Sequence, residues 1–262
     1  MNIIPIHPLL ASGALQFAFE KATPEGKATI TVLFFLSLFS WSIIITKSRQ
    51  LYLARKSAGR FFTSYNATRD PLDVKREGKA FAGAPVFRVY RSGAAELEYQ
   101  LGKATGNAGR ISMSAFEAVK VVLEEAASAE AMRLEKGMIV LSTAVAGGPF
   151  IGLLGTVWGV METFAGIARA GAASLTAMAP GVAGALIATV VGLLVAIPAM
   201  FAYNFMVTTI RVITQELDGF SARYVTQIEH NYVDNRDLED KIADALQRAE
   251  RIKTAAQPLA IR

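Results

Sequence analysis

The sequence contains no cysteine and only two histidines, so it lacks the usual ligands and nucleophiles of many catalytic sites. The absence of cysteine excludes disulfides and thiolate metal sites. His7 and His230 lie outside the apolar runs, and the sequence has no GxSxG motif. The segment LGKATGNAGR lacks the first glycine and the final Ser or Thr of a phosphate-binding loop, since Leu97 and Ala104 stand there. We therefore expect no metal, no cofactor and no enzymatic activity.

Charged residues are also scarce, at 19% of 262 residues, and they leave three long uncharged runs. These runs are Ala28 to Thr46 (19 residues), Gly137 to Met161 (25) and Ala170 to Ile210 (41). Each reaches the roughly 18 to 20 residues that cross the hydrocarbon of a bilayer. A soluble chain of this length would have too little polar surface to cover three such helices. The sequence therefore predicts an all-α membrane protein with three transmembrane helices and long cytoplasmic extensions.

The pattern between the runs predicts the boundaries of these segments. The third run would be about 60 Å long as one helix, so it must contain a loop, which Pro180 and Gly181 place before about Met178. The helical pattern continues beyond Thr46, and the one from Met113 runs into the second span without an evident breaker. After Tyr203 an amphipathic cytoplasmic helix is expected, because apolar residues recur every three or four positions at Ile210, Ile213, Leu217, Phe220, Tyr224 and Ile228. The predicted segments are an N-terminal amphipathic segment (1–27), three spans (28–46, 138–168, 178–207), a periplasmic turn (169–177) and two cytoplasmic helical regions (47–137, 208–262).

The distribution of lysine and arginine predicts the orientation. Residues 47–136 hold 16 Lys and Arg against 10 Asp and Glu, and Lys47 and Arg49 end the first run. Basic connections remain in the cytoplasm, which places the N-terminus in the periplasm and the C-terminus in the cytoplasm. No cleavable signal peptide is evident, so the first span is expected to be a retained anchor. The basic residues are interspersed with acidic ones, and nucleic-acid binding is not indicated.

Small residues form a stripe along the second span. A helical wheel brings them within about 60° of one another, and they are Gly148, Gly152, Gly155, Gly159 and Gly166. Such a stripe lets another helix approach closely in a membrane. Glu162 shares this register and should face protein or a water-filled passage, since a carboxylate facing lipid costs a few kcal/mol or more. An alternative is that Glu162 lies near the outer interface and is hydrated there.

Two threonines are candidates for a polar lining. Thr156 lies beside the glycine stripe, and Thr189 lies on the small-residue face of the third span. A helical wheel places around Thr189 the residues Val182, Ala185, Gly192, Ala196 and Ala199. The opposite face is large and suits lipid, and it holds Ile187, Val191, Leu194, Phe201 and Phe205. Each is about 12 residues from the predicted turn, so both hydroxyls are expected near the membrane midplane. The alternative is that these threonines only pack, with each hydroxyl bonded to its own helix.

The segments GPFIGLLGTVWGV and APGVAGALIATVVGLLVAIPAMFAYN resemble the two signature helices of the MotA/TolQ/ExbB proton-channel family, in its TolQ/ExbB branch. The resemblance implies a subunit of a bacterial inner-membrane motor. It also implies five copies around the two membrane helices of a single-span TolR/ExbD-like partner that carries an aspartate, and a TonB- or TolA-like protein further out. In this comparison Thr156 and Thr189 match the pore threonines.

One position departs from the family pattern. The third helix usually reads P-G-I-A-E-A-L, whereas this chain reads PGVAGAL, with Gly184 in place of the glutamate. We hypothesise that Glu162 replaces this carboxylate at a similar depth on the neighbouring helix. Loss of output in Glu162→Gln with partial rescue by Gly184→Glu would support the hypothesis, and full activity of Glu162→Gln would refute it.

Two classes of function remain open. The first is a subunit of a proton-driven motor. Its output could be envelope maintenance, nutrient import, gliding or secretion, and the sequence does not decide whether the driving ion is H⁺ or Na⁺. The second is a membrane scaffold that encloses a partner helix without conducting protons. An uncoupler should stop the output of a motor and leave a scaffold unaffected.

Overall fold

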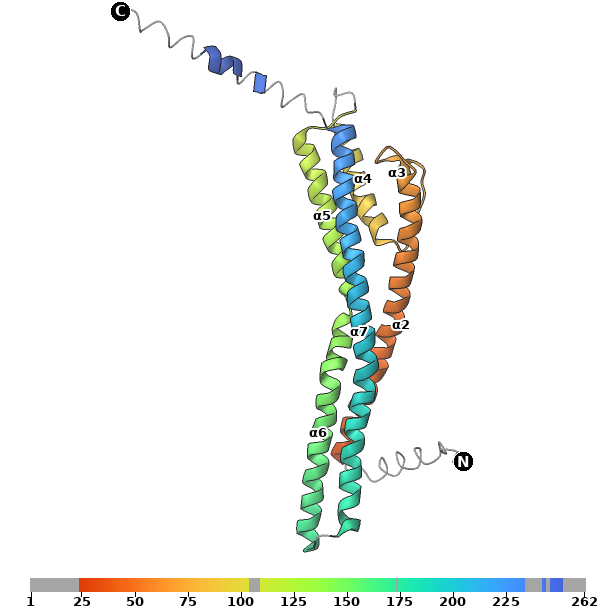
Figure 1. Ribbon diagram of the computed structural model, residues 1–262, viewed down its shortest axis with the longest axis vertical. Helices are drawn as coiled ribbons and strands as arrows, with labels where there is room; N and C mark the ends of the chain where they lie inside the picture. Colours follow the sequence, from red (N-terminus) through yellow and green to blue (C-terminus); the bar gives the residue numbers. More distant parts are fainter. Residues whose placement is uncertain (1–23, 104–108, 173, 234–241, 244–245, 252–262) are drawn as a thin grey trace, which may run out of the picture. The chain divides into compact units, whose positions relative to one another are not determined.

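The structure, a computed structural model, describes residues 24–103, 109–172, 174–233, 242–243 and 246–251 (Figure 1). Its named helices are α2 (Pro24–Asn66), α3 (Asp73–Arg76), α4 (Pro85–Lys103), α5 (Met113–Glu135), α6 (Met138–Ala170) and α7 (Leu175–Tyr232). The described residues form no strand, only an isolated bridge between Ile111 and Val233. Three helical stretches are long and apolar enough to cross a membrane, in α2, in α5–α6 and in α7. The predictions of an all-α fold and of three spanning helices are confirmed.

Helix α2 begins at Pro24 and continues for 43 residues. Proline suits the first helical position because its missing N–H has no partner there, and Glu25 in the first turn complements the helix dipole. The helix continues without interruption past Lys47 to Asn66, as the pattern beyond the first apolar run predicts.

The prediction of a continuous helix from Met113 into the second span is wrong. Helix α5 ends at Glu135, and α6 begins at Met138 after Gly137, whose φ is 89°. This left-handed conformation is readily accessible only to glycine, and it interrupts the hydrogen-bond ladder. Sequence periodicity did not reveal the break because apolar residues continue on both sides of it.

The connection between α6 and α7 is shorter than the predicted turn at 169–177. Helix α6 ends at Ala170, and Gly171 caps it with a φ of 67° and an N–H that donates to the Ile167 carbonyl at 3.0 Å. Helix α7 then begins at Leu175 and includes Pro180. Pro180 was expected to follow the loop directly, but it lies five residues inside α7. A proline there removes only one backbone hydrogen bond, so the helix can begin before it.

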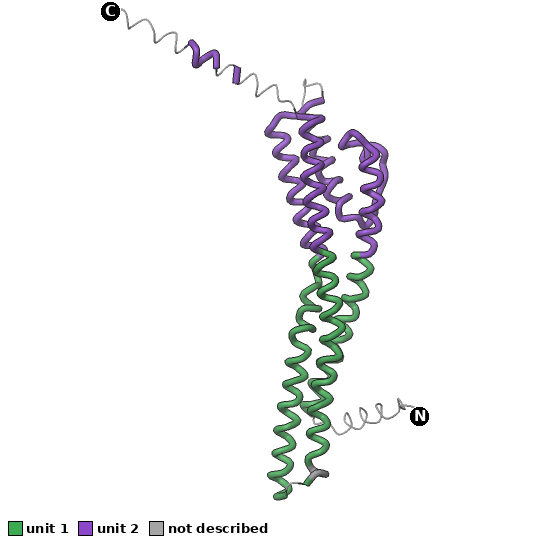
Figure 2. Tube along the Cα trace, viewed as in Figure 1, with its two compact units in different colours: residues 1–51, 135–210 green, residues 52–134, 211–262 purple. Residues whose placement is uncertain are grey.

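The chain divides into two compact units (Figure 2). Unit 1 comprises residues 1–51 and 135–210, and unit 2 comprises residues 52–134 and 211–262. Helices α2 and α7 contribute residues to both units, whereas α4 and α5 belong to unit 2 and α6 to unit 1. The predicted division into periplasmic, membrane and cytoplasmic segments remains a prediction.

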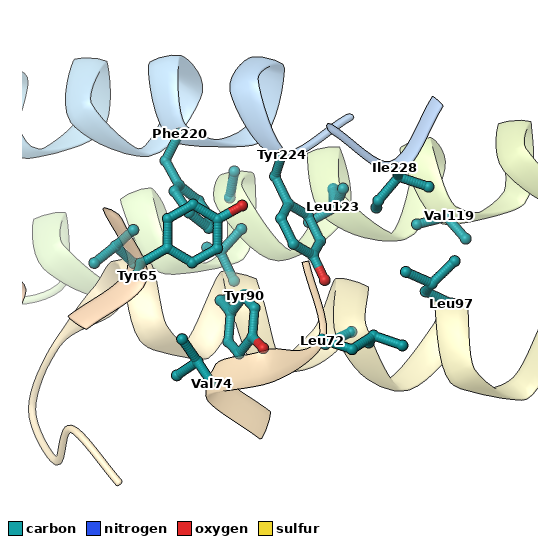
Figure 3. Close-up of a cluster of buried hydrophobic side chains, with 14 of the residues drawn as sticks. Tyr65, Leu72, Val74, Tyr90, Leu97, Val119, Leu123, Phe220, Tyr224 and Ile228 are labelled. Atoms are coloured by element: carbon teal, nitrogen blue, oxygen red, sulfur yellow. The ribbon is translucent and has the colours of Figure 1, made fainter. Parts of the chain in front are cut away.

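Unit 2 has a core of aromatic and aliphatic side chains. Figure 3 shows Tyr65, Tyr90, Phe220 and Tyr224 gathered where α2, α4 and α7 meet. The rings of Phe220 and Tyr224 stack at 5.6 Å, and that of Tyr90 meets the Tyr224 ring edge-on at 5.4 Å. Such pairs each contribute about 0.5–1.5 kcal/mol beyond area burial. The periodic apolar positions predicted after the third span are all buried, namely Ile210, Ile213, Leu217, Phe220, Tyr224 and Ile228.

A polar network borders this core. The Tyr232 hydroxyl donates to Asp70 at 2.6 Å, and Arg76 donates to the same carboxylate at 2.7 Å. Burial alone would raise the pKa of Asp70, but these bonds and the Leu72 N–H stabilise the carboxylate and lower that pKa. Burial raises the pKa of Tyr90 to about 12, so this hydroxyl stays protonated at physiological pH.

An ion pair joins α4 to α5. Arg88 donates from Nε to Glu130 at 2.6 Å and also from a terminal nitrogen to the second carboxylate oxygen. The two side chains are only 27% and 11% exposed, so the pair is mostly removed from water. Two charges that leave water lose their hydration, and a bidentate pair of hydrogen bonds between guanidinium and carboxylate offsets this cost.

Some predicted features lie wholly or partly outside the described residues. These are the N-terminal amphipathic segment up to residue 23, the centre of the loop at 101–110, and most of the polar C-terminal region from residue 234 onward.

Candidate ion pathway along α6 and α7

Four of the five glycines of the predicted stripe lie directly against α7. A Cβ atom added to Gly148 would lie 3.0 Å from the Gly192 carbonyl oxygen, and one added to Gly159 would lie 2.8 Å from that of Gly181. Real Cβ atoms essentially never come below 3.0 Å of a heavy atom, and contacts of 3.0–3.4 Å are already tighter than most, so these glycines let the two backbones approach closely.

We call this close contact of α6 and α7 the α6–α7 seam. Helix α7 contributes glycines of its own to it. A Cβ at Gly192 would lie 2.6 Å from the Gly148 carbonyl oxygen, and one at Gly181 would lie 2.2 Å from the Thr163 hydroxyl oxygen. Gly181 was not part of the predicted small-residue face, although its place beside Pro180 within a helical pattern could have indicated it. Close approach is therefore required of both helices.

Gly166 differs from the other members of the stripe. It is half-buried, and an added Cβ would meet nothing within 4 Å. The seam thus ends near Thr163, which is buried and donates its hydroxyl to the Gly159 carbonyl at 2.8 Å. Within one chain, the glycine face from Gly148 to Gly159 is filled by α7.

The structure places Thr156 and Thr189 within about 3 Å of the same level of the antiparallel α6–α7 pair. A Cβ at Gly155 would lie 2.5 Å from the Ala188 Cβ, and Thr156 and Thr189 directly follow these two contacting residues. Both threonines are half-buried. The Thr156 hydroxyl donates to the Leu153 carbonyl at 2.6 Å. Its oxygen retains acceptor capacity for a further partner.

Helix α2 adds a third threonine that sequence reasoning missed. Thr29 is 4% exposed, and its hydroxyl oxygen would lie 3.1 Å from a Cβ at Gly155. Its hydroxyl donates to the Gly26 carbonyl at 2.8 Å. A polar residue in the second turn of an apolar helix is a weak signal, and only the tertiary contact reveals its position at the seam.

Glu162 forms an ion pair with Arg169, two turns further along α6. The side chains are 46% and 70% exposed, so the carboxylate lies on the surface of the single chain. The position that carries the glutamate in the sequence pattern, Gly184, is buried instead. Since Gly159 contacts Ala185 and Thr163 contacts Gly181, Glu162 lies about two residues, or about 3 Å, closer to the α6–α7 connection than Gly184. The two positions are near in level but differ in burial.

The outer face of α7 is apolar and exposed. Leu194, Phe201 and Phe205 are each at least 65% exposed, as predicted for a face that suits lipid, whereas Ile187 and Val191 of the same predicted face are half-buried. Ala185, Ala196 and Ala199 are buried on the opposite side, again as predicted. Val182 was assigned to that buried side but is 40% exposed.

Comparisons with known proteins agree with this arrangement. The model of the MotA/TolQ/ExbB proton channel family matches residues 89–219, which include the α6–α7 seam. The chain is 29% identical to a biopolymer transport protein ExbB of Neisseria meningitidis over 209 residues, which cover 79% of this chain and 93% of that protein. It is 32% identical to the Tol-Pal system protein TolQ of Haemophilus influenzae over 212 residues, covering 79% and 90%. It is also 32% identical to an ExbB of Xanthomonas campestris over 194 residues, covering 73% and 77%. With its helical fold, three apolar helices and close-packed α6–α7 pair, the chain belongs to the MotA/TolQ/ExbB proton channel family and is a membrane protein.

Proposed function

We propose that the chain is the channel subunit of an inner-membrane motor that converts the proton motive force into mechanical work on envelope or outer-membrane machinery. The observation that carries the proposal is the pair of half-buried threonines, Thr156 and Thr189, which lie within about 3 Å of one level of the glycine-packed α6–α7 seam. Two hydroxyls near one level in otherwise apolar helices provide hydrogen-bonding groups where lipid provides none.

The threonine hydroxyls would line the path of the ion. Because Thr156 already donates to the Leu153 carbonyl, its oxygen presents lone pairs outward and can accept a hydrogen bond from water or from a protonated carboxylic acid. This polarity suits a membrane aspartate of a TolR/ExbD-like partner, which would bind and release the proton. Each charge that crosses about 100 mV releases about 2.3 kcal/mol, which is enough to drive a conformational step.

Glu162 would supply the negative charge that the sequence pattern places at Gly184. Its pairing with Arg169 lowers the cost of holding a carboxylate in an apolar helix. In a single chain the pair is exposed, so we propose that it faces a partner helix or a neighbouring copy. Glu162 would then shape the electrostatic field at the end of the path nearest the α6–α7 connection.

The assembly would contain five copies of this chain around the partner helices, with the N-terminus in the periplasm and the C-terminus in the cytoplasm. A TonB- or TolA-like protein that spans the periplasm would receive the force. The excess of Lys and Arg in residues 47–136 supports this orientation.

The proposal is tested by isosteric removal of the hydroxyls. Thr156→Val and Thr189→Val should each sharply reduce proton flux and force output when the chain is produced with its native partner. Thr143→Val is the matched control, because Thr143 is an exposed threonine of the same helix whose hydroxyl also bonds within the helix, to Ile139 at 2.8 Å. Equal activity of all three variants would refute the threonine pathway.

A second comparison isolates the carboxylate. Glu162→Gln should reduce output, and Arg169→Gln should also change it by leaving the carboxylate without its paired charge. Full activity of Glu162→Gln would exclude a role for this carboxylate and leave the threonine pathway intact. Output that persists in all variants and in the presence of an uncoupler would favour a non-conducting scaffold.

A further inference from the structure

A groove of about 640 Å³ lies between α5 and α7 in unit 2. Its lining combines small residues with a charged rim. The small lining residues are Ala127, Ser128, Ala131, Ser221 and Ala222. Small side chains along two adjacent helices leave room for a third element to approach both.

The groove has the length of a short helix. On α5 it extends from Lys120 to Ala131 and on α7 from Thr214 to Val225, which corresponds to about 16 Å on each helix. The two helices are antiparallel, because the Ile111 N–H just before α5 donates to the Tyr232 carbonyl at the end of α7. One end of the groove therefore lies near Lys120 and Val225, and it accommodates about three helical turns.

One polar group in this groove lacks a partner. Ser221 is 8% exposed, and its hydroxyl makes no hydrogen bond with any described residue. A buried hydroxyl without a partner is costly, and such groups are rare in folded proteins. Ser221 therefore marks a place beside the groove where the packing of the described residues leaves a polar group unsatisfied.

We propose that the chain's own C-terminal segment, residues 242–253, binds in the α5–α7 groove as an amphipathic helix. Its apolar residues recur every three or four positions, and they are Ile242, Ala245, Leu246, Ala249 and Ile252. Residues 246–251 are helical, and the side chains of Ile242 and Leu246 are 52% and 63% exposed. Ile242 and Leu246 thus expose apolar side chains four residues apart, and a helix over residues 242–253 would be about 16 Å long, close to the groove length.

The connection is long enough for this return. Val233, which follows α7, lies eight residues beyond Val225, or about 12 Å along the helix axis. Residues 234–241 span up to about 26 Å when extended. The segment enters at the end near Lys120 and Val225 and runs antiparallel to α7.

Charge also favours this occupant. The groove carries Glu124 and Asp218, while Lys120 forms an ion pair with Glu117. Residues 241–253 hold four basic and two acidic side chains, namely Lys241, Arg248, Arg251 and Lys253 against Asp244 and Glu250. A net positive segment against an acidic rim gains attraction without burying the charges.

The absence of cysteine permits a direct test by crosslinking. In the protein in its native membranes, Ser128→Cys with Ala249→Cys should form an intramolecular disulfide when an added oxidant such as copper phenanthroline accepts the two electrons, because both positions lie about 10–12 Å from the entry end of the groove. Ala129→Cys with Ala249→Cys is the matched control, since Ala129 is an exposed neighbour on α5 that does not line the groove. We expect the first pair to crosslink at least about tenfold faster, as a local effective concentration requires.

A third variant adds Leu246→Asp to the Ser128→Cys and Ala249→Cys pair. Loss of the apolar anchor should reduce the crosslinking rate to that of the control pair. Equal rates for the two cysteine pairs would overturn the proposal. A disulfide that joins two chains, seen as a doubled mass, would also overturn it, because the occupant would then be the segment of another copy.

Discussion

The closest backbone contact in the α6–α7 seam provides the most direct test of the fold. In Gly192→Ala, the new Cβ would lie 2.6 Å from the Gly148 carbonyl oxygen and 3.1 Å from the Gly152 Cα. Both contacting atoms belong to backbone, so no flexible side chain can move aside. Restoring an ordinary contact of 3.4 Å to the carbonyl requires the helices to separate by about 0.8 Å.

The expected cost follows from this separation. A gap of 0.5–1 Å forfeits about a quarter to a half of each dispersion contact along the seam. Overpacking of this kind costs about 1–3 kcal/mol, and we expect about 2 kcal/mol for Gly192→Ala. For a protein of this size that corresponds to a fall in Tm of about 4–8 °C.

The assay is thermal unfolding of the purified protein in a mild detergent, followed by circular dichroism. Gly166→Ala is the matched control, because Gly166 also belongs to unit 1 but a Cβ added there meets nothing within 4 Å. We expect this control to be neutral or slightly stabilising, since alanine has the higher helix propensity. Equal Tm values for Gly192→Ala, Gly166→Ala and the wild type would refute the argument from backbone contact.

Three further predictions concern unit 2. Gly93→Ala should lower the free energy of unfolding of unit 2 by about 1–3 kcal/mol, because the new Cβ would lie 2.4 Å from a methyl carbon of the buried Leu123. Denaturant unfolding measures this change, and Gly102→Ala is the control because its new Cβ meets nothing within 4 Å. Glu130→Ala should cost up to about 3 kcal/mol by leaving Arg88 mostly buried and without its carboxylate, and a double-mutant cycle would measure this coupling. The pKa of the Asp70 carboxyl is lowered from 3.8, so the stabilisation that its charge provides is present above that pH and is lost as the pH falls through the lower pKa. Asp70→Asn should therefore be less stable than the wild type at pH 7. In acid-unfolding curves this difference in stability should shrink below about pH 4.

Much of the helical framework could be predicted from local pattern. Uncharged runs located the three apolar helices, and the period from Ile210 to Ile228 identified the face of α7 that enters the cores. The glycines from Gly148 to Gly159, which lie against α7, could be grouped from sequence because small residues on one helical face produce a signal that needs no tertiary information. These features are repeated along a helix, which is why sequence reveals them.

Features that depend on one residue or on distant contacts were missed. The break at Gly137 is a single left-handed residue within an otherwise helical pattern, and glycine alone does not indicate which conformation it adopts. The contact of Thr29 with the seam joins residues more than a hundred positions apart. The Glu162–Arg169 pair lies at a spacing of two helical turns, so it could have been found by searching for opposite charges at i and i+7.

The break between α5 and α6 also bears on which changes of chain length the protein can absorb. One residue inserted into a helix turns everything after it by about 100° and moves it by about 1.5 Å. Helices α2 and α7 each contribute a packed face to both units without interruption, so an insertion in either would put one face out of phase with the other. The non-helical link at Lys136 and Gly137 has no such continuity and can take up an added residue locally. Length variation among related chains should therefore concentrate at this link and in the loops, and be rare within α2 and α7.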